Sequence, residues 1–112
     1  MLPSDRTLKA TEYDKVKKLG KVYQSNSFQL LINDRKDKNL TKFGFIISNN
    51  VDKLAVHRNR VKRAMRESAR QTMFSIPNGM DMIFIAKQNI VKMTTDEIMK
   101  EMKEYLLNTR FN

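Results

Sequence analysis

The segment from Asp52 to Phe74 constrains the fold most, because its apolar residues recur at helical spacing beside a dense row of cations. A helix turns by about 100° per residue, so the small and apolar residues share one side. A helix with one apolar side has to lie against another layer of structure. Asp52 is the expected cap, and Pro77-Asn78-Gly79 breaks the chain soon after the helix. The apolar side consists of Val61, Ala64, Met65, Ser68 and Thr72.

Strand patterns on both sides of this helix predict the layer that it covers. Residues 22–33 alternate, so that Phe28, Leu30 and Ile32 share one face. Residues 43–48, FGFIIS, form a second apolar strand, which we expect to pair antiparallel with the first across the charged loop 33–42. Residues 80–86, MDMIFIA, predict a further buried strand.

Helix signals also occur near both ends of the chain. Thr11 and Asp14 make a start signal for a short helix that stops at Gly20, and residues 1–10 are expected to form an extended, loosely held arm. Thr94 and Glu97 make a capping box for a last helix through about Leu107. The order α-β-β-α-β-α, with room for an extra short strand, predicts a single α/β (α+β) two-layer sandwich domain over residues 1–112.

Charge and composition narrow the classes of function. Lys and Arg total 22 against 12 acidic residues, a formal net charge of +10, which favours nucleic acid over a membrane surface as partner. There is no cysteine, and no apolar run approaches the roughly 20 residues of a membrane helix. We therefore expect a cytoplasmic protein that binds no membrane, with no catalytic residue and no metal site of its own.

The cationic side of the central helix is the candidate binding surface. Like charges one turn apart repel by a few tenths of a kcal/mol per pair, so this density suggests an external polyanion. Charge alone leaves DNA and RNA open. Arg60 falls outside the arc of roughly 140° that holds the other members of this side. Within the arc lie Arg58, Asn59, Lys62, Arg63, Arg66 and Arg70.

The string RNRVKRAMRE after Ala55-Val56 strongly resembles the signature of the bacterial ribonuclease P protein subunit. The resemblance covers nearly the whole chain: Gly44 and Ser48 resemble a Gly-x-x-x-Ser strand of that family, and Asp81 to Lys87 resembles its Asp-hydrophobic-Ala-Arg/Lys strand. The family usually has Phe at the position of Tyr13.

The resemblance implies a left-handed βαβ crossover and an endonuclease in which a large RNA subunit is the catalyst. In such a ribonucleoprotein, Mg²⁺ is bound mainly by the RNA, and one protein monomer pairs with one RNA. The protein assists removal of the 5′ leader from precursor tRNA. The residues implied to bind the RNA subunit are Arg58, Asn59, Arg60, Lys62, Arg63, Arg66 and Arg70. The residues implied to form a cleft for the single-stranded leader are Tyr13, Lys17, Phe28, Ser48, Ala86 and Lys87.

Departures from the family pattern fall in this cleft. Lys17 and Leu31 stand where aromatic residues are frequent, and Asn49-Asn50 replaces a usual Lys-Lys pair. Two other functions stay open. One is a structural RNA-binding protein of ribosomal-protein-like fold without a role in tRNA processing. The other is a DNA-binding regulator, which the lack of a compact helix-turn-helix pattern before the basic helix disfavours.

Overall fold

The computed structural model of the protein describes residues 2–109. The helices are α1 (Ala10–Leu19), α2 (Ala55–Thr72) and α3 (Thr95–Asn108). The strands are β1 (Lys21–Gln24), β2 (Phe28–Asp34), β3 (Lys42–Ile46) and β4 (Met80–Ala86), and short 3₁₀ turns lie at Ser4–Arg6, Met73–Ser75 and Gln88–Lys92. The predicted order of elements is confirmed. The extra short strand is β1, which forms a hairpin with β2 where the sequence suggested one strand.

Within residues 2–109 the strands form one four-stranded sheet in the order β1-β2-β4-β3. β1 and β4 both pair antiparallel with β2, whereas β3 runs parallel to β4. The predicted antiparallel pairing of β2 with β3 is therefore wrong, because β4 lies between them. β4 is apolar along nearly its whole length and buried on both faces, so it takes a central place. The segment β3-α2-β4 is a βαβ unit, and its left-handed sense stays a prediction.

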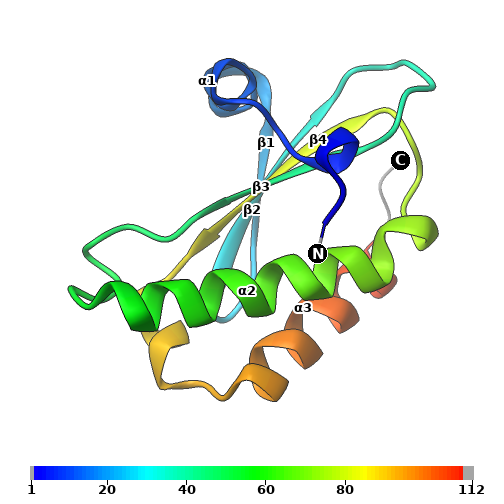
Figure 1. Ribbon diagram of the computed structural model, residues 1–112. Helices are drawn as coiled ribbons and strands as arrows, with labels where there is room; N and C mark the ends of the chain where they lie inside the picture. Colours follow the sequence, from blue (N-terminus) through cyan, green and yellow to red (C-terminus); the bar gives the residue numbers. More distant parts are fainter. Residues whose placement is uncertain (1, 110–112) are drawn as a thin grey trace.

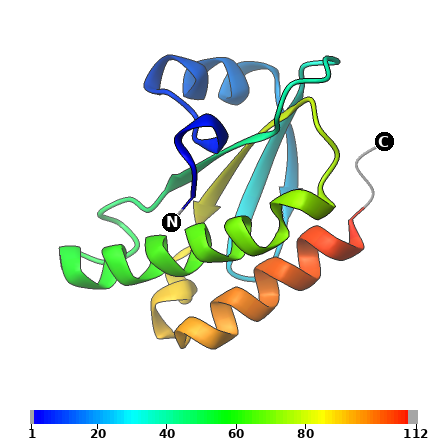
Figure 2. The same cartoon turned by 45° about the vertical axis from the view of Figure 1, so that its right-hand side comes forward.

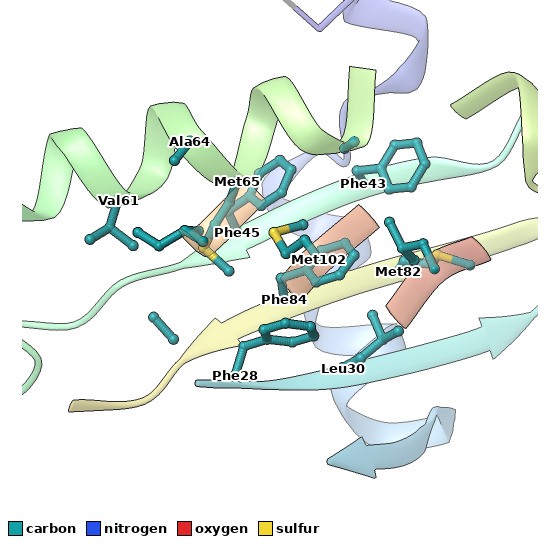
Figure 3. Close-up of a cluster of buried hydrophobic side chains, with 14 of the residues drawn as sticks. Phe28, Leu30, Phe43, Phe45, Val61, Ala64, Met65, Met82, Phe84 and Met102 are labelled. Atoms are coloured by element: carbon teal, nitrogen blue, oxygen red, sulfur yellow. The ribbon is translucent and has the colours of Figure 1, made fainter. Parts of the chain in front are cut away.

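The helices cover the two faces of the sheet unequally. α2 and α3 lie together on one face, which we call the core face, and α1 lies on the opposite face, the α1 face (Figures 1 and 2). The core-face cluster centres on Phe84, whose ring lies 5.6 Å from that of Phe28 and 5.7 Å from that of Phe45 (Figure 3). The main sandwich is thus the sheet against α2 and α3, with α1 as an addition.

Alternation along β2 explains why both faces are apolar. Phe28, Leu30 and Ile32 point into the core-face cluster, as the spacing predicted. Leu31 points the other way and packs with Ile83 of β4. The complete α1-face cluster is small and consists of Leu8, Val16, Leu31 and Ile83, flanked by Tyr13, Ile46 and Ile85.

The N-terminal arm is packed onto the sheet, so the prediction of a loosely held arm is wrong. The Leu8 N–H donates to the Phe43 carbonyl at 2.9 Å, and Thr7 bridges to Phe43 in parallel. Leu2, Arg6 and Leu8 are all buried. Arg6 also donates to the Thr41 carbonyl at 3.3 Å. The apolar residues of the arm cover the free edge of β3, which the sequence alone did not indicate.

The predicted start of α3 agrees with the structure, whereas those of α1 and α2 differ from it. The predicted capping box of α3 is confirmed, because Glu97 N–H donates to the Thr94 hydroxyl at 3.1 Å and Thr94 N–H donates to the Glu97 carboxylate at 2.8 Å. The predicted Thr11 and Asp14 signal for α1 is wrong by two residues, since the Glu12 carboxylate accepts from Lys9 N–H at 2.9 Å instead. α2 begins at Ala55, later than expected, and the Asp52 carboxylate accepts from Leu54 N–H just before it.

A buried ion pair fixes the loop between β2 and β3. The Arg35 guanidinium pairs with Asp81 at the start of β4 and donates to the carbonyls of Met80 (2.8 Å) and Leu40 (2.9 Å). Asp37 also pairs with Arg35, at 3.0 Å. Asp81 is only 2% exposed. Burial raises the pKa of the Asp81 carboxyl, and the nearby Arg35 opposes that rise.

Candidate nucleic-acid interface

Helix α2 presents one face to the protein and one to solvent, as the sequence predicted. Val61, Met65, Ser68 and Ala69 are sealed inside, and Ala64 and Thr72 are nearly so. The helix packs on β3 and on α3, so its opposite side remains uncovered along its length. The basic face, defined as the side chains of Arg58, Asn59, Lys62, Arg63, Arg66 and Arg70, lies on that uncovered side.

Two members of the basic face have partners within the protein. Arg58 Nη1 donates to the carbonyls of Asp52 (2.7 Å) and Lys53 (2.8 Å), which ties the preceding loop to the helix. Arg70 Nε donates to Glu67 at 2.9 Å, and this bond lowers the pKa of Glu67 to about 2. These contacts leave other nitrogens of each guanidinium for an external anion.

Lys62, Arg63 and Arg66 form the unpaired centre of the basic face. They take part in none of the ion pairs of residues 2–109. Arg63 is exposed, while Lys62 and Arg66 are half-buried by their stems. Arg66 lies one turn after Lys62 and Arg63, and these cations without acidic partners repel one another in the free protein. A phosphate backbone along α2 would relieve that repulsion.

Arg60 does not belong to the basic face. Its Nη1 and Nη2 donate to the carbonyls of Met93 and Val91, both at 3.0 Å. These carbonyls lie at the end of the turn that leads into α3. The helical projection placed Arg60 apart, whereas the family resemblance placed it among the RNA-binding residues. The geometry agrees with the projection: this guanidinium holds α2 to the connection before α3.

We expect Arg60→Ala to lower the free energy of unfolding by about 1–3 kcal/mol, because two partly buried carbonyls lose a charged donor. The salt dependence of RNA binding should change little. Urea denaturation and binding titrations at several salt concentrations measure the two effects. Arg63→Ala is the matched control, with the opposite expectation of a flatter salt slope and unchanged stability. Equal slope changes in both variants would contradict this division.

Tyr13 ties α1 to the edge strand β3. Its hydroxyl oxygen accepts a hydrogen bond from Phe45 N–H at 3.2 Å, which satisfies a backbone donor at the edge of the sheet. The ring rests on Gly44, where an added Cβ would lie 2.6 Å from the Tyr13 Cζ and Oη atoms. The family resemblance assigned Tyr13 to the leader cleft. The structure also gives its hydroxyl a positioning role that the usual Phe of the family lacks.

We expect Gly44→Ala to destabilise the protein by about 1–3 kcal/mol, because the new methyl group overlaps the Tyr13 ring. Tyr13→Ala removes that overlap. The two substitutions together should therefore cost less than the sum of their separate effects. A double-mutant cycle by urea denaturation measures this coupling. If the two losses of stability simply add, α1 can move away from residue 44 without cost and the overlap does not occur.

The six residues predicted for a leader cleft do not come together. Phe28 is fully buried on the core face, with its ring 5.4 Å from that of Tyr105. Ala86 is the register partner of Phe28 and is also buried. Both lie on the face opposite to α1. Their placement in a cleft between α1 and the sheet is therefore wrong, because the alternation that buries Leu30 buries Phe28 as well.

Of the other four predicted cleft residues, two lie on α1 and two follow the neighbouring parallel strands β3 and β4. Tyr13 and Lys17 lie one turn apart on α1, and Lys17 is exposed. Ser48 is exposed after the end of β3. Lys87 follows β4, and its Nζ donates to the Ser25 carbonyl at 2.6 Å, so it fastens the turn between β1 and β2. Their contact with a leader stays a prediction.

Sequence reasoning missed the partly open residues of the α1 face. Gln29, Ile46 and Ile85 are half-buried there, and Val22 is 58% exposed. The signal was available, because Gln29 and Leu31 alternate with Phe28 and Leu30. The open surface is therefore aliphatic and amide in character, with Tyr13 as its aromatic.

Residues 2–109 bring together no group of three His, Asp or Glu side chains that would hold a metal ion. No helix in this part of the chain is long and apolar enough to cross a membrane. The single histidine, His57, contacts Asp52 through Nδ1 at 2.8 Å.

A sheet backed by two helices, one of them with an uncovered row of cations, defines a small basic nucleic-acid-binding protein of the α/β class. A family model described as Ribonuclease P matches residues 1–110, and the chain belongs to this family.

Individual relatives agree with this assignment. The ribonuclease P protein component of Finegoldia magna is 35% identical over 97 residues, covering 87% of this chain and 80% of that protein. That of Pseudanabaena sp. is 29% identical over 98% of this chain and 96% of its own. The structure of the Staphylococcus aureus RNase P protein superposes with a TM-score of 0.81, at 28% identity and with 94% of each chain covered. The mixed fold with three helices and a four-stranded sheet matches that structure.

Proposed function

We propose that this protein acts as the protein subunit of ribonuclease P in removal of the 5′ leader from precursor tRNA. Its basic face on α2 binds the catalytic RNA subunit, with Lys62, Arg63 and Arg66 as the central contacts. One protein monomer pairs with one RNA in the cytoplasm. The observation that carries the proposal is that these three cations form no ion pair within residues 2–109. Membership of the family supports it.

We further propose that the catalytic centre lies in the RNA. The protein offers no gathered acids within residues 2–109 for a two-metal site, and its buried acid Asp81 is engaged with Arg35. Mg²⁺ is accordingly assigned mainly to RNA ligands. The part of the protein is electrostatic: its cations offset phosphate repulsion where the RNA and the precursor meet.

The leader is assigned to the open part of the α1 face, where Tyr13 and Lys17 are the contacts retained from the cleft that the family resemblance implied. A base stacked on Tyr13 would contribute about 1–3 kcal/mol. Loss of the ring should weaken binding of precursor tRNA more than binding of mature tRNA. Equal losses of affinity for precursor and mature tRNA would contradict the assignment of the leader to this face.

Reconstitution tests the proposed function directly. The protein is added to its cognate RNA subunit, and cleavage of precursor tRNA is followed at low, near-physiological Mg²⁺. We expect the protein to permit cleavage at a Mg²⁺ concentration where the RNA alone is slow. Tight binding without stimulation would instead favour a structural RNA-binding protein. Preference for duplex DNA at matched salt would favour a DNA-binding regulator.

A further inference from the structure

Phe74 is the only exposed phenylalanine of residues 2–109. Phe28, Phe43, Phe45 and Phe84 are all buried, whereas Phe74 is 82% exposed. Burial of the ring would stabilise the protein, and this position forgoes nearly all of that gain. Single exposed apolar residues are common on protein surfaces, so the surroundings of the ring decide whether it is suited to bind a partner.

A buried cation lies over one face of this ring. Arg6 Cζ is 5.7 Å from the centroid of the Phe74 ring. Arg6 is only 6% exposed, and it forms no ion pair within residues 2–109. In that part of the chain its guanidinium makes one hydrogen bond, from Nη1 to the Thr41 carbonyl. A nearly buried arginine without an acidic partner is rare, and the electron-rich face of Phe74 stabilises its charge.

The contact with Arg6 also holds the ring in place. Thr41, which accepts from Arg6, is itself sealed in the protein, because its hydroxyl donates to the Pro77 carbonyl at 2.6 Å and accepts from Met80 N–H at 3.1 Å. Arg6 is therefore tied to the sheet. A ring that is held before a partner binds loses little conformational entropy on binding. Since Arg6 covers one face, the exposed surface of Phe74 includes its other face.

Phe74 continues the row of cations on α2. Arg66, Arg70 and Phe74 are spaced four residues apart, so about 6 Å of helix rise separates each from the next. Phe74 lies in the 3₁₀ turn Met73–Ser75 directly after α2, and the backbone at Thr72 is still helical. The ring therefore follows Arg70 at the C-terminal end of the basic face.

A fixed aromatic ring at the end of a row of cations matches the chemistry of unpaired RNA. The cations bind phosphates, and the ring offers a stacking surface that accepts any base, because every base has a π face. A second copy of this chain is a poor occupant, since its own formal net charge of +10 would be repelled by the surrounding cations.

We propose that Phe74 stacks on one unpaired base of the RNA subunit, beside the phosphates that the basic face binds. Arg6 is a positioning residue that holds the ring. Arg70 binds a neighbouring phosphate through Nη1, which makes no bond with Glu67. The inference rests on the proposed function for the RNA subunit as the partner.

Replacement of Phe74 by leucine tests the stacking. We expect Phe74→Leu to bind the RNA subunit at least about fivefold more weakly, since a stacked base is worth about this factor or more. The salt slope should stay unchanged, because no charge is removed. Phe74→Tyr keeps a ring and should retain the affinity. Leu107→Ala, at an exposed apolar residue of α3, is the control and should bind normally. Fluorescence anisotropy at several salt concentrations measures both quantities, and unchanged affinity in Phe74→Leu would overturn the proposal.

A tryptophan at position 74 reports the contact directly. The chain contains no tryptophan, so Phe74→Trp introduces a single fluorophore at the site. We expect saturable quenching when the RNA subunit is added at physiological salt, and little change with precursor tRNA alone. Leu19→Trp, at the exposed end of α1, is the control. Quenching of Leu19→Trp alone would overturn the site, and quenching of Phe74→Trp by precursor tRNA alone would overturn the RNA subunit as its source.

The positioning role of Arg6 is measured in the same Phe74→Trp protein. Arg6→Met should reduce the quenching reached at saturation, because the ring is then no longer held. Arg6→Lys keeps a cation and should restore most of it. A purely structural role would lower the resistance of Arg6→Met to urea and leave the quenching at saturation unchanged, which would overturn the positioning role.

Two further outcomes separate this inference from its alternatives. Sedimentation of the free protein tests for self-association. If Phe74→Leu abolishes self-association and leaves RNA affinity unchanged, the ring contacts a second copy and the proposal is overturned. If the protein stimulates cleavage of precursor tRNA but Phe74→Leu binds the RNA subunit normally, the proposed function stands and only this inference fails.

Discussion

Replacing Lys62, Arg63 and Arg66 together with glutamine is expected to abolish most of the electrostatic affinity for the RNA subunit. Each phosphate contact contributes roughly 0.7–0.9 to the log–log salt slope, so three lost contacts should reduce it by roughly 2–2.7. The fold should be unaffected, because these side chains make no ion pair within residues 2–109 and glutamine favours helix. Fluorescence anisotropy across a salt series measures the slope, and urea denaturation checks the stability.

The control for this variant has the same net charge in a different place. Lys15, Lys18 and Lys100 are exposed helical residues outside α2. Their replacement by glutamine changes the formal charge from +10 to +7, as the first variant does (10 − 3 = 7). We expect a much smaller loss of slope in this control. An equal loss in both would mean that the protein attracts RNA by total charge and that α2 holds no defined contact.

Removal of Arg35 is expected to have the largest effect on folding. Arg35→Met leaves the Asp81 carboxylate buried without its cation, and breaking a buried pair in this way costs about 3–5 kcal/mol. Met keeps most of the volume of the stem. Adding Asp81→Asn should restore part of the loss, because the remaining buried group is then neutral. Restoration stays partial, since the carbonyls of Met80 and Leu40 still lack their donor.

The pH dependence of Arg35→Met identifies the cause of its instability. Burial raises the pKa of Asp81, and the variant lacks the cation that opposes this rise. With a folded-state pKa above the unfolded value, the folded protein binds more protons, and its free energy of unfolding increases as pH falls through the folded-state pKa. The variant with Asp81→Asn should lack this increase. Urea denaturation between neutral and acidic pH measures it. A flat profile in Arg35→Met would assign the loss to packing.

Local patterns in the sequence predicted the helices and strands well, but they did not predict which strands pair with each other. The period of residues 55–72 placed Val61 and Met65 inside and left the basic face outside. The capping box at Thr94 fixed the start of α3. In contrast, the neighbours of β3 depend on the competition among apolar strands for the centre of the sheet. That competition is decided by non-local contacts, which no short pattern reports.

For the binding surfaces, too, local patterns predicted where a side chain lies, but they did not predict contacts with residues that are distant in the sequence. Helical projection correctly separated Arg60 from the basic face, and the family motif obscured that separation. Phe28 was assigned to a cleft by resemblance, although its own alternation with Leu30 predicted the core. The role of the Asp81 carboxylate depends on Arg35, which is 46 positions away along the chain. A single acidic residue at the start of a strand gives no sign of such a partner.

The central position of β4 has a consequence for synthesis of the chain. β4 comes after every other strand, yet both β2 and β3 pair with it. A nascent chain that has reached only residue 79 can form the β1–β2 hairpin and α2, but it has no strand to join the hairpin to β3. Two apolar strand edges then stay open until Met80–Ala86 has left the ribosome. Those edges therefore stay exposed to other chains for as long as the ribosome needs to translate α2 and the strand that follows it.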